Sequence, residues 1–290
     1  MKAALASATA RLAAENAPSP RMNAELLLMF TLECDRAYLY AHTERELTAE
    51  EQFRYEAALA ERARGVPAQY ITGHQEFWGM DLIVTPAVLI PRPETEHVIE
   101  TVLELVASGE SSGRGHPANT IRIADVGTGS GCIALALAKE LPDAEIHATD
   151  ISVAALEIAR ANAARHQLEH RIQFHQTDLL TGLDPGFDFI VSNPSYVGES
   201  EEDQVQMEVR KFEPRLAVFA GPTGGEVITR LIAQAHSALR RDGWLVMEIS
   251  GSIVNAVQET LAGWDEVRIT FDLQGIPRVA RARKPNVQIS

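Results

Sequence analysis

The sequence predicts an α/β protein, in which a mainly parallel sheet carries helices on both faces and follows a smaller helical domain. Residues 1–64 show only helical patterns, whereas from Thr120 onward short apolar strands alternate with helices. Between these regions, short apolar runs broken by Gly and Pro indicate a β-hairpin. We therefore expect a helical domain over 1–74, a β-hairpin linker over 75–93 and an α/β domain over 94–290.

The first region predicts a small bundle of short helices. Apolar residues recur at helical spacing, and Thr48 with Glu51 forms a capping-box signature. None of these helices is long enough to be stable alone, so they must pack together. We expect helices over 3–16, 21–33 and 48–64, followed by short strands from Gln69 to Pro93.

The second region predicts a layered α/β arrangement, because buried-strand patterns and helical patterns alternate along the chain. The polar, Gly-rich stretch 108–119 is expected to be a surface loop. We expect strands over 121–126, 145–150, 171–175, 187–192, 243–249, 267–271 and 278–283. We expect helices over 94–106, 132–141, 153–166, 224–241 and 253–261.

Composition narrows the class of protein. The 290 residues carry a formal net charge of −14, and acidic side chains exceed basic ones both before and after Arg92. A free-standing nucleic-acid binder usually presents a basic face, so we expect no direct nucleic-acid partner. Cys34 and Cys132 lie far apart and form no metal-ligand spacing. With no apolar run of membrane-spanning length and no signal peptide, we expect a cytoplasmic protein without metal or membrane contact. We also expect a monomer.

A glycine loop follows the first expected strand of the α/β region and opens a helix. Glycines there permit a tight turn and close approach of the backbone to a ligand. A dinucleotide fingerprint has the spacing Gly-x-Gly-x-x-Gly, but here the third glycine comes one residue early. This spacing favours S-adenosylmethionine over NAD. The loop residues are Gly127, Thr128, Gly129, Ser130 and Gly131, and Asp150 at the end of the next strand is placed to accept hydrogen bonds from ribose hydroxyls.

A second motif, Asn193-Pro194-Ser195-Tyr196, follows the buried strand 187–192 at the same expected edge of the sheet. An Asn side-chain oxygen can accept one N–H of a planar NH2 group, and the carbonyl of Pro194 can accept the other. Proline stiffens the turn, and Tyr196 can stack on a flat group. The motif predicts methyl transfer to a planar nitrogen, with most of the rate gained by positioning.

The chain resembles the protein-(glutamine-N5) methyltransferases that modify peptide chain release factors, and the resemblance covers nearly its whole length. Four stretches carry it: 65–79, 89–96, 125–131 and 193–196. The first two are specific to this group, whereas the last two recur among adenine-N6 methyltransferases. The stretches 212–214 and 272–278 also look like the family.

The resemblance implies a helical substrate-binding domain, a hairpin linker and a Rossmann-like catalytic domain. It implies S-adenosylmethionine as cofactor, S-adenosylhomocysteine as product, and the glutamine of the Gly-Gly-Gln motif of release factors as substrate. By resemblance, the glycine loop, Asp150, Leu179 and Asn193 hold the cofactor. The glutamine amide is then framed by Asn193, Pro194, Ser195 and Tyr196, with Asn193, Pro194 and Tyr196 as catalytic residues.

Two positions depart from the family pattern. Ser195 stands where a second proline is usual, but Pro194, whose carbonyl accepts from the amide, is retained. We therefore expect activity with a looser turn. Leu179 stands where the family often places an aromatic residue beside the adenine, and this change bears on cofactor affinity rather than identity.

The sequence leaves other functions open. The substrate could be a glutamine of another protein, such as a ribosomal protein. Adenine-N6 methylation of nucleic acid uses similar loops, although the acidic charge and the first two family stretches oppose it. A non-catalytic adaptor is opposed by the intact glycine loop and Asn193, and an NAD dehydrogenase by the early Gly131.

Overall fold

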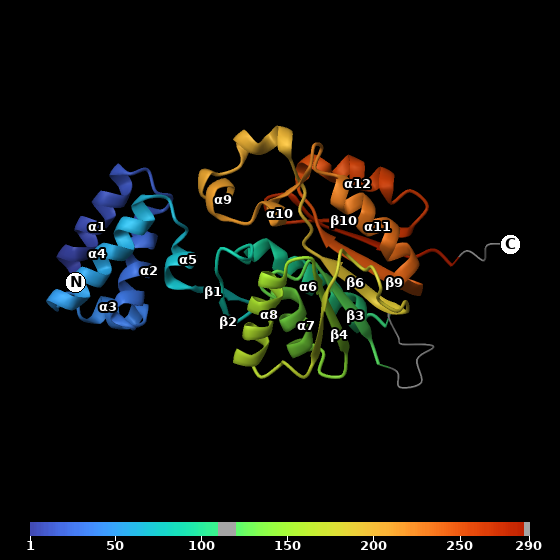
Figure 1. The fold of residues 1–290 in the computed structure, drawn as a ribbon, viewed down its shortest axis with the longest axis horizontal. Coiled ribbons are helices and arrows are strands. Elements are labelled where there is room, and N and C mark those ends of the chain that lie inside the picture. The colour runs from blue at the N-terminus through green and yellow to red at the C-terminus, as the bar shows by residue number, and fades with distance from the viewer. Residues whose placement is uncertain (110–119, 287–290) are drawn as a thin grey trace. The chain divides into compact units, whose positions relative to one another are not determined.

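The computed structural model describes residues 1–109 and 120–286 (Figure 1), so most of the surface loop expected over 108–119 lies outside the described residues. The chain forms two compact units. One consists of Met1–His74 together with Gln206–Phe212, and the other of Gln75–Val205 with Glu213–Ser290. The helical unit therefore includes a segment from far along the chain, which the expected boundaries did not contain.

The helical unit is a bundle whose first four helices bury their apolar faces against one another. Leu12, Leu27, Leu28 and Leu59 are almost fully buried, and so is Tyr55, whose hydroxyl donates to the carbonyl of Ala24 (2.9 Å). The helices of this unit are α1 (Lys2–Ala14), α2 (Pro20–Leu32), α3 (Arg36–Ala41), α4 (Ala49–Ala63), α5 (Ala68–Thr72) and α9 (Met207–Phe212).

Local sequence explains where these helices begin and end. The capping box that was predicted at Thr48 and Glu51 is confirmed. The strand expected to start at Gln69 is wrong, since this residue lies in α5. Pro67 precedes that helix and Gly73 ends it in the left-handed conformation, with φ 78°. Proline and glycine at these positions frame a short helix as readily as a turn between strands.

An ion pair of Arg62 holds the segment Gln206–Phe212 in the helical unit. This side chain is only 2% exposed, and its guanidinium pairs with the Glu208 carboxylate of α9 at 2.8 Å. It also donates to Asn23 Oδ1 (2.9 Å) and to the carbonyl of Val66 (3.2 Å). A buried guanidinium is tolerated only when its donors are satisfied, so α9 supplies a partner that this unit needs.

The second unit is built on a seven-stranded sheet in the order β10-β11-β9-β6-β3-β4-β5. The strands β9, β6, β3, β4 and β5 run parallel, and β11 pairs antiparallel with both β9 and β10. The sheet strands are β3 (Arg122–Val126), β4 (Glu145–Asp150), β5 (Ile172–Gln176), β6 (Phe187–Ser192), β9 (Leu239–Glu248), β10 (Asp265–Phe271) and β11 (Pro277–Arg283).

Helices cover both faces of this sheet, which confirms the predicted α/β fold (Figure 1). The helices of this second unit are α6 (Glu96–Ala107), α7 (Cys132–Glu140), α8 (Val153–Arg165), α10 (Arg215–Val218), α11 (Glu226–Ala238) and α12 (Val254–Thr260). Short 3-10 turns are η1 (Pro93–Thr95), η2 (Glu199–Gln204) and η3 (Gly251–Ile253). Two small two-stranded sheets pair β1 (His74–Phe77) with β2 (Met80–Ile83), and β7 (Val197–Gly198) with β8 (Phe219–Gly221).

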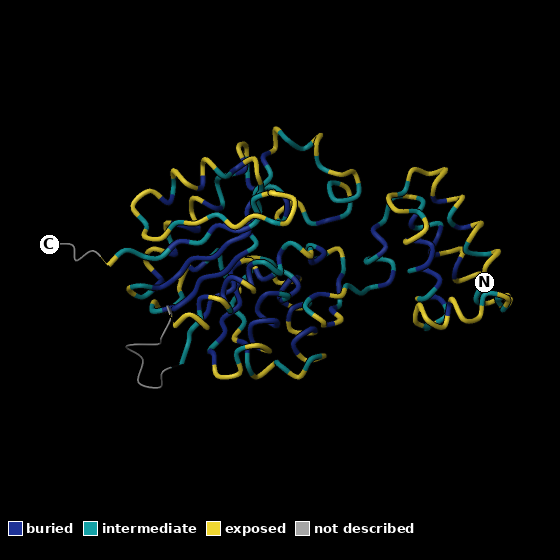
Figure 2. Tube along the Cα trace, turned by 180° about the vertical axis from the view of Figure 1, so that it is seen from behind, coloured by how far each residue is buried: buried dark blue, intermediate teal, exposed yellow. Residues whose placement is uncertain are grey.

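The core divides into two layers because successive side chains of a strand point to opposite faces. Ile123 and Val246 pack with α6 and α7, whereas their neighbours Ala124 and Leu245 pack with α11 and α12. The central strands β3, β4 and β6 are buried along most of their length, as the dark trace through the sheet in Figure 2 shows, whereas the edge strand β10 has no buried residue.

Asn162 of α8 ties the hairpin to the glycine loop. Its side chain is fully buried. The amide nitrogen donates to the carbonyls of Ile83 (3.0 Å) and Ser130 (2.9 Å), and the amide oxygen accepts from the backbone N–H of Ile83 (2.7 Å). One side chain therefore satisfies backbone groups of β2 and of the loop that follows β3.

Candidate active site

The carboxyl ends of five parallel strands meet at one edge of the sheet, and the predicted site residues lie there. The glycine loop follows β3, Asp150 ends β4, Leu179 comes shortly after β5, and Asn193 follows β6. The adjacent β9 ends in Glu248. In an open α/β sheet this edge is the usual place for a ligand.

The glycine loop turns sharply against the end of β4. The backbone N–H groups of Gly127 and Thr128 both donate to the carbonyl of Thr149, at 2.9 and 2.8 Å. Gly127 has φ 71°, and no described heavy atom lies within 4 Å of where a Cβ would stand. Open space in front of a backbone that only glycine adopts easily is a cradle that fits a small ligand such as S-adenosylmethionine.

Asp150 is held by the loop that it faces. The N–H of Gly129 donates to its Oδ2 (2.9 Å), and the N–H of Ser152 donates to its Oδ1 (2.8 Å). Burial raises the pKa of this carboxyl, and these backbone hydrogen bonds oppose the rise. A carboxylate has about four acceptor positions, so Asp150 can still accept from a ribose hydroxyl.

The side chains of Thr128 and Ser130 are buried rather than directed into the open space, so these residues offer a ligand mainly their backbone. The Thr128 hydroxyl donates to Asp125 Oδ2 (2.6 Å), which also accepts from the N–H of Ala134 (3.1 Å). Burial raises the pKa of Asp125 to about 7 despite these two hydrogen bonds. Asp125 therefore holds the loop against the start of α7.

Leu179 has a left-handed backbone with φ 54° and packs against the layer formed by α11 and α12. Its segment is fixed by the N–H of Thr177, which donates to the carbonyl of Asp150 (3.0 Å), and by that of Leu180, which donates to Gln234 Oε1 (2.9 Å). Its contact with adenine remains a prediction.

The Asn193 side chain belongs to a chain of hydrogen bonds that the sequence did not reveal. Its Nδ2 donates to Thr95 Oγ1 (3.0 Å), and this hydroxyl donates to Glu248 Oε2 (2.5 Å). The Tyr196 hydroxyl donates to the other carboxylate oxygen of Glu248 (3.3 Å). Two residues of the Asn-Pro-Ser-Tyr motif are thus held by one buried carboxylate.

Gly224 lets the segment after the motif bend back on itself. It has φ 86°, and a Cβ there would stand 2.5 Å from the carbonyl oxygen of Tyr196 and 2.9 Å from the nitrogen of Gly198. The parallel pairing of β7 with β8 brings these backbones together. A side chain at this position would displace the loop that carries Tyr196.

Sequence reasoning missed Thr95 and Glu248. Glu248 could have been suspected, because it is an acidic residue at the end of the otherwise apolar run Trp244-Leu245-Val246-Met247. A carboxylate that ends a buried parallel strand lies at the ligand edge of the sheet. Nothing in the sequence pairs it with Thr95, which lies 153 residues earlier.

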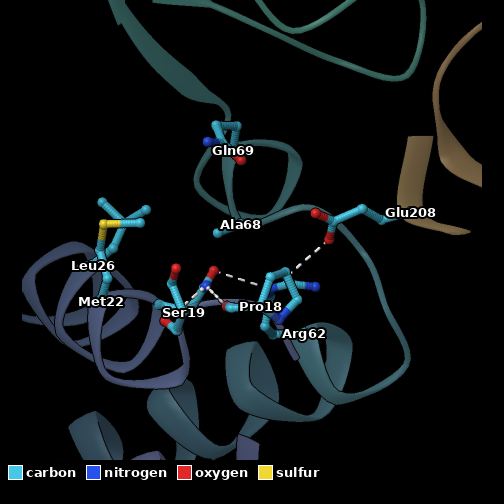
Figure 3. A pocket seen from close by; sticks show the side chains of 9 residues that line it. Pro18, Ser19, Met22, Leu26, Arg62, Ala68, Gln69 and Glu208 are labelled. Carbon is cyan, nitrogen blue, oxygen red and sulfur yellow. Dashed lines mark hydrogen bonds and ion pairs between the residues drawn. The ribbon is translucent and has the colours of Figure 1, made fainter. Parts of the chain in front are cut away.

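The helical unit contains a separate hollow of about 200 Å³, shown in Figure 3. None of the predicted site residues lines it. Its walls are formed by Pro18, Ser19, Met22, Asn23, Leu26, Arg62, Ala68, Gln69 and Glu208. Over 1–109 and 120–286, no helix combines the length and apolar character needed to span a membrane, and no group of three His, Cys, Asp or Glu side chains could hold a metal ion.

Fold and loop together define a methyltransferase. The model of the methyltransferase small domain matches residues 116–212, and that of the PrmC N-terminal domain matches residues 3–73. Among solved structures, the hMettl16 catalytic domain in complex with a MAT2A 3′UTR hairpin superposes with a TM-score of 0.58 and 18% identity. The superposition covers 88% of this chain and 95% of the hMettl16 chain, and this likeness shows the fold alone.

Curated relatives then give the family. A release factor glutamine methyltransferase of Koribacter versatilis is 54% identical over 98% of this chain and 99% of its own length. Enzymes of the same name from Rhodopirellula baltica and Chlorobaculum tepidum are 38% and 42% identical, over 92% and 89% of this chain and 90% and 88% of theirs. The chain belongs to the release factor glutamine methyltransferase family, whose methyl donor is S-adenosylmethionine.

Proposed function

We propose that this protein methylates the side-chain amide nitrogen (N5) of a glutamine in peptide chain release factors, within their Gly-Gly-Gln motif. The observation that supports this most directly is the direction of the hydrogen bond between Asn193 and Thr95. Because Nδ2 is engaged as a donor, Oδ1 is left to accept an N–H from a substrate. An amide acceptor of this kind matches a primary carboxamide.

The chain's residues then act by holding the substrate amide. Asn193 Oδ1 accepts one N–H, and the carbonyl of Pro194 accepts the other, so the nitrogen is fixed in plane. Tyr196, half-buried beside Glu248, borders the flat group, and Ser195 completes the turn. The amide nitrogen is a weak nucleophile, so alignment supplies most of the rate gain. The proton that leaves the nitrogen after transfer passes to solvent, and no strong base is required.

S-adenosylmethionine supplies the electrophilic methyl group at this edge of the sheet. We propose that the backbone of Gly127 to Gly131 and the Asp150 carboxylate hold it, with Leu179 against its adenine and Asn193 between the two ligands. The glycine cradle and the remaining acceptor capacity of the Asp150 carboxylate support this assignment.

Mass spectrometry tests the proposed activity directly. A purified release factor incubated with this protein and S-adenosylmethionine should gain one methyl group on the glutamine of its Gly-Gly-Gln motif. A release factor with that glutamine replaced by alanine should gain none. Cofactor binding without any gain would refute release factors as substrates and direct the search to other glutamine-bearing proteins and then to adenine.

We also propose that the helical unit binds the release factor. Its hollow combines the apolar side chains of Met22 and Leu26 with the polar Gln69 and the paired Glu208, as a surface for a protein segment would. Met22 is 58% exposed at this hollow, although it is a large apolar residue.

Met22→Asp should therefore weaken release-factor binding about tenfold, because it places a charge against an apolar contact. Binding is measured by calorimetry with the release factor, and cofactor affinity should not change. Phe53→Asp is the matched control, since Phe53 is 75% exposed on α4 of the same unit but does not line the hollow. Equal effects of the two substitutions would contradict this assignment.

We propose that the protein works in the cytoplasm as a monomer and meets no nucleic acid directly. A net charge of −14 opposes nonspecific binding to phosphate backbones.

A further inference from the structure

Glu248 is a buried carboxylate in the candidate site that takes no part in the proposed contacts with substrate or cofactor. It is 4% exposed and ends β9, whose other residues from Trp244 onward are apolar and buried. Burying a carboxylate costs several kcal/mol unless it is well hydrogen-bonded. A buried carboxylate at the ligand edge of the sheet is therefore a candidate for a functional role.

The hydrogen bonds around Glu248 have only one consistent direction. An ionised carboxylate only accepts, so both hydroxyls that reach it, those of Thr95 and Tyr196, must donate. The hydroxyl of Thr95 donates its single proton to Glu248, so the Thr95 oxygen can only accept a hydrogen bond from Asn193. Asn193 must then direct Nδ2 toward Thr95 and Oδ1 away from it.

The opposite orientation of the Asn193 amide would disable the site. With Oδ1 turned toward Thr95, Nδ2 would meet the substrate amide, and two donor groups would face one another. An unpaired donor in a desolvated site costs about 1–3 kcal/mol, enough to displace the substrate nitrogen from its aligned position.

We propose that Glu248 and Thr95 form a relay that sets the orientation of the Asn193 side-chain amide, so that it presents an acceptor to the substrate. Both are positioning residues, because they act through Asn193. This inference rests on the proposed function for its catalytic consequence, but the orientation itself is a property of the protein alone.

The relay depends on the ionisation of Glu248, and neighbouring polar and charged side chains shift the pKa of this carboxyl. Burial raises the pKa of Glu248 to about 6, opposed by the hydrogen bonds from Thr95 and Tyr196. The Glu94 carboxylate of η1 raises this pKa further, and the Arg278 guanidinium of β11 lowers it. Arg278 is itself paired with Glu94 (3.4 Å) and with Asp272 (2.8 Å).

Protonation of Glu248 removes the constraint. A neutral carboxyl can donate to Thr95, whose hydroxyl is then free to donate to Asn193 and stabilise the opposite amide orientation. The fraction of correctly oriented Asn193 should therefore fall as pH decreases through about 6, and recover above it.

NMR tests the orientation without any substrate. The side-chain NH2 signals of Asn193 are assigned by their loss in Asn193→Ala, and are followed from pH 5 to pH 8. They should titrate with a midpoint near that of Glu248, and the titration should disappear in Glu248→Gln. A titration that persists in Glu248→Gln, or signals that do not move at all, would overturn the relay.

Kinetics tests its consequence with a matched pair of substitutions. Thr95→Val keeps the shape but removes the hydroxyl, so kcat should fall about tenfold, the worth of one such hydrogen bond. The KM for S-adenosylmethionine should not change, and Thr95→Ser should restore most of the loss. Wild-type kcat should decrease below about pH 6, and Glu248→Gln should lack this limb.

The two kinds of failure are distinguishable. If release factors are not methylated at all, the proposed function fails while the NMR titration still decides the relay. If they are methylated but Thr95→Val turns over like the wild type with unshifted Asn193 signals, the relay is refuted and the function stands. Thermal denaturation of each variant separates either outcome from loss of the fold.

Discussion

Asn193→Ala should lower the rate of methyl transfer to the release factor by about 10²- to 10³-fold, as removal of one precisely placed polar group does in other active sites. The substitution deletes the proposed acceptor for one N–H of the substrate amide. It leaves β6, whose residues are all buried, and the glycine loop untouched. Cofactor affinity should fall far less than the rate, because the glycine loop and Asp150 keep their proposed contacts with S-adenosylmethionine. The rate is measured at saturating S-adenosylmethionine, and affinity by calorimetry.

Asn255→Ala provides the matched control for this result. Asn255 is exposed on α12 of the same unit and is expected to be neutral. A folded Asn193→Ala variant that turns over within a few-fold of the wild type would remove Asn193 from the mechanism.

Asn162→Leu should lower the free energy of unfolding by about 3–5 kcal/mol. The leucine would leave the N–H and carbonyl of Ile83 and the carbonyl of Ser130 without their partner in a fully buried position, at about 1–3 kcal/mol each before relaxation. For a unit of this size, the loss corresponds to a fall of roughly 10 °C in Tm.

Thermal denaturation followed by cofactor titration measures both consequences of this substitution. S-adenosylmethionine should bind more weakly, because the loop at Ser130 loses its anchor. Asn255→Leu makes the same chemical change on the surface of α12 and should leave Tm close to the wild-type value. Equal midpoints for the two variants would show that the buried hydrogen bonds contribute nothing net.

Most of the α/β fold was predictable from the sequence because its signals are local. Alternation of buried strands with helices and the capping box at Thr48 are each contained within a few residues, and the structure confirms them. The candidate site motifs 127–131 and 193–196 were predicted in the same way, since the end of a buried strand identifies the ligand edge. Their roles in binding and catalysis stay predictions.

The remainder depends on contacts between distant parts of the chain. The bond between Thr95 and Glu248 spans 153 residues, and no spacing rule connects them. The short helix α5 was mistaken for strand, because its framing proline and glycine suit either structure. The membership of Gln206–Phe212 in the helical unit is likewise a property of packing, which periodicity does not report.

Because α9 belongs to the helical unit, it affects the order in which the chain folds during synthesis. The ribosome completes residues 1–74 well before it reaches Glu208, a delay on the order of ten seconds at ordinary elongation rates. Throughout this interval the nascent helices lack the carboxylate that neutralises Arg62. The first unit to emerge is thus among the last to be finished, and a fragment ending at His74 would keep that guanidinium without its anionic partner.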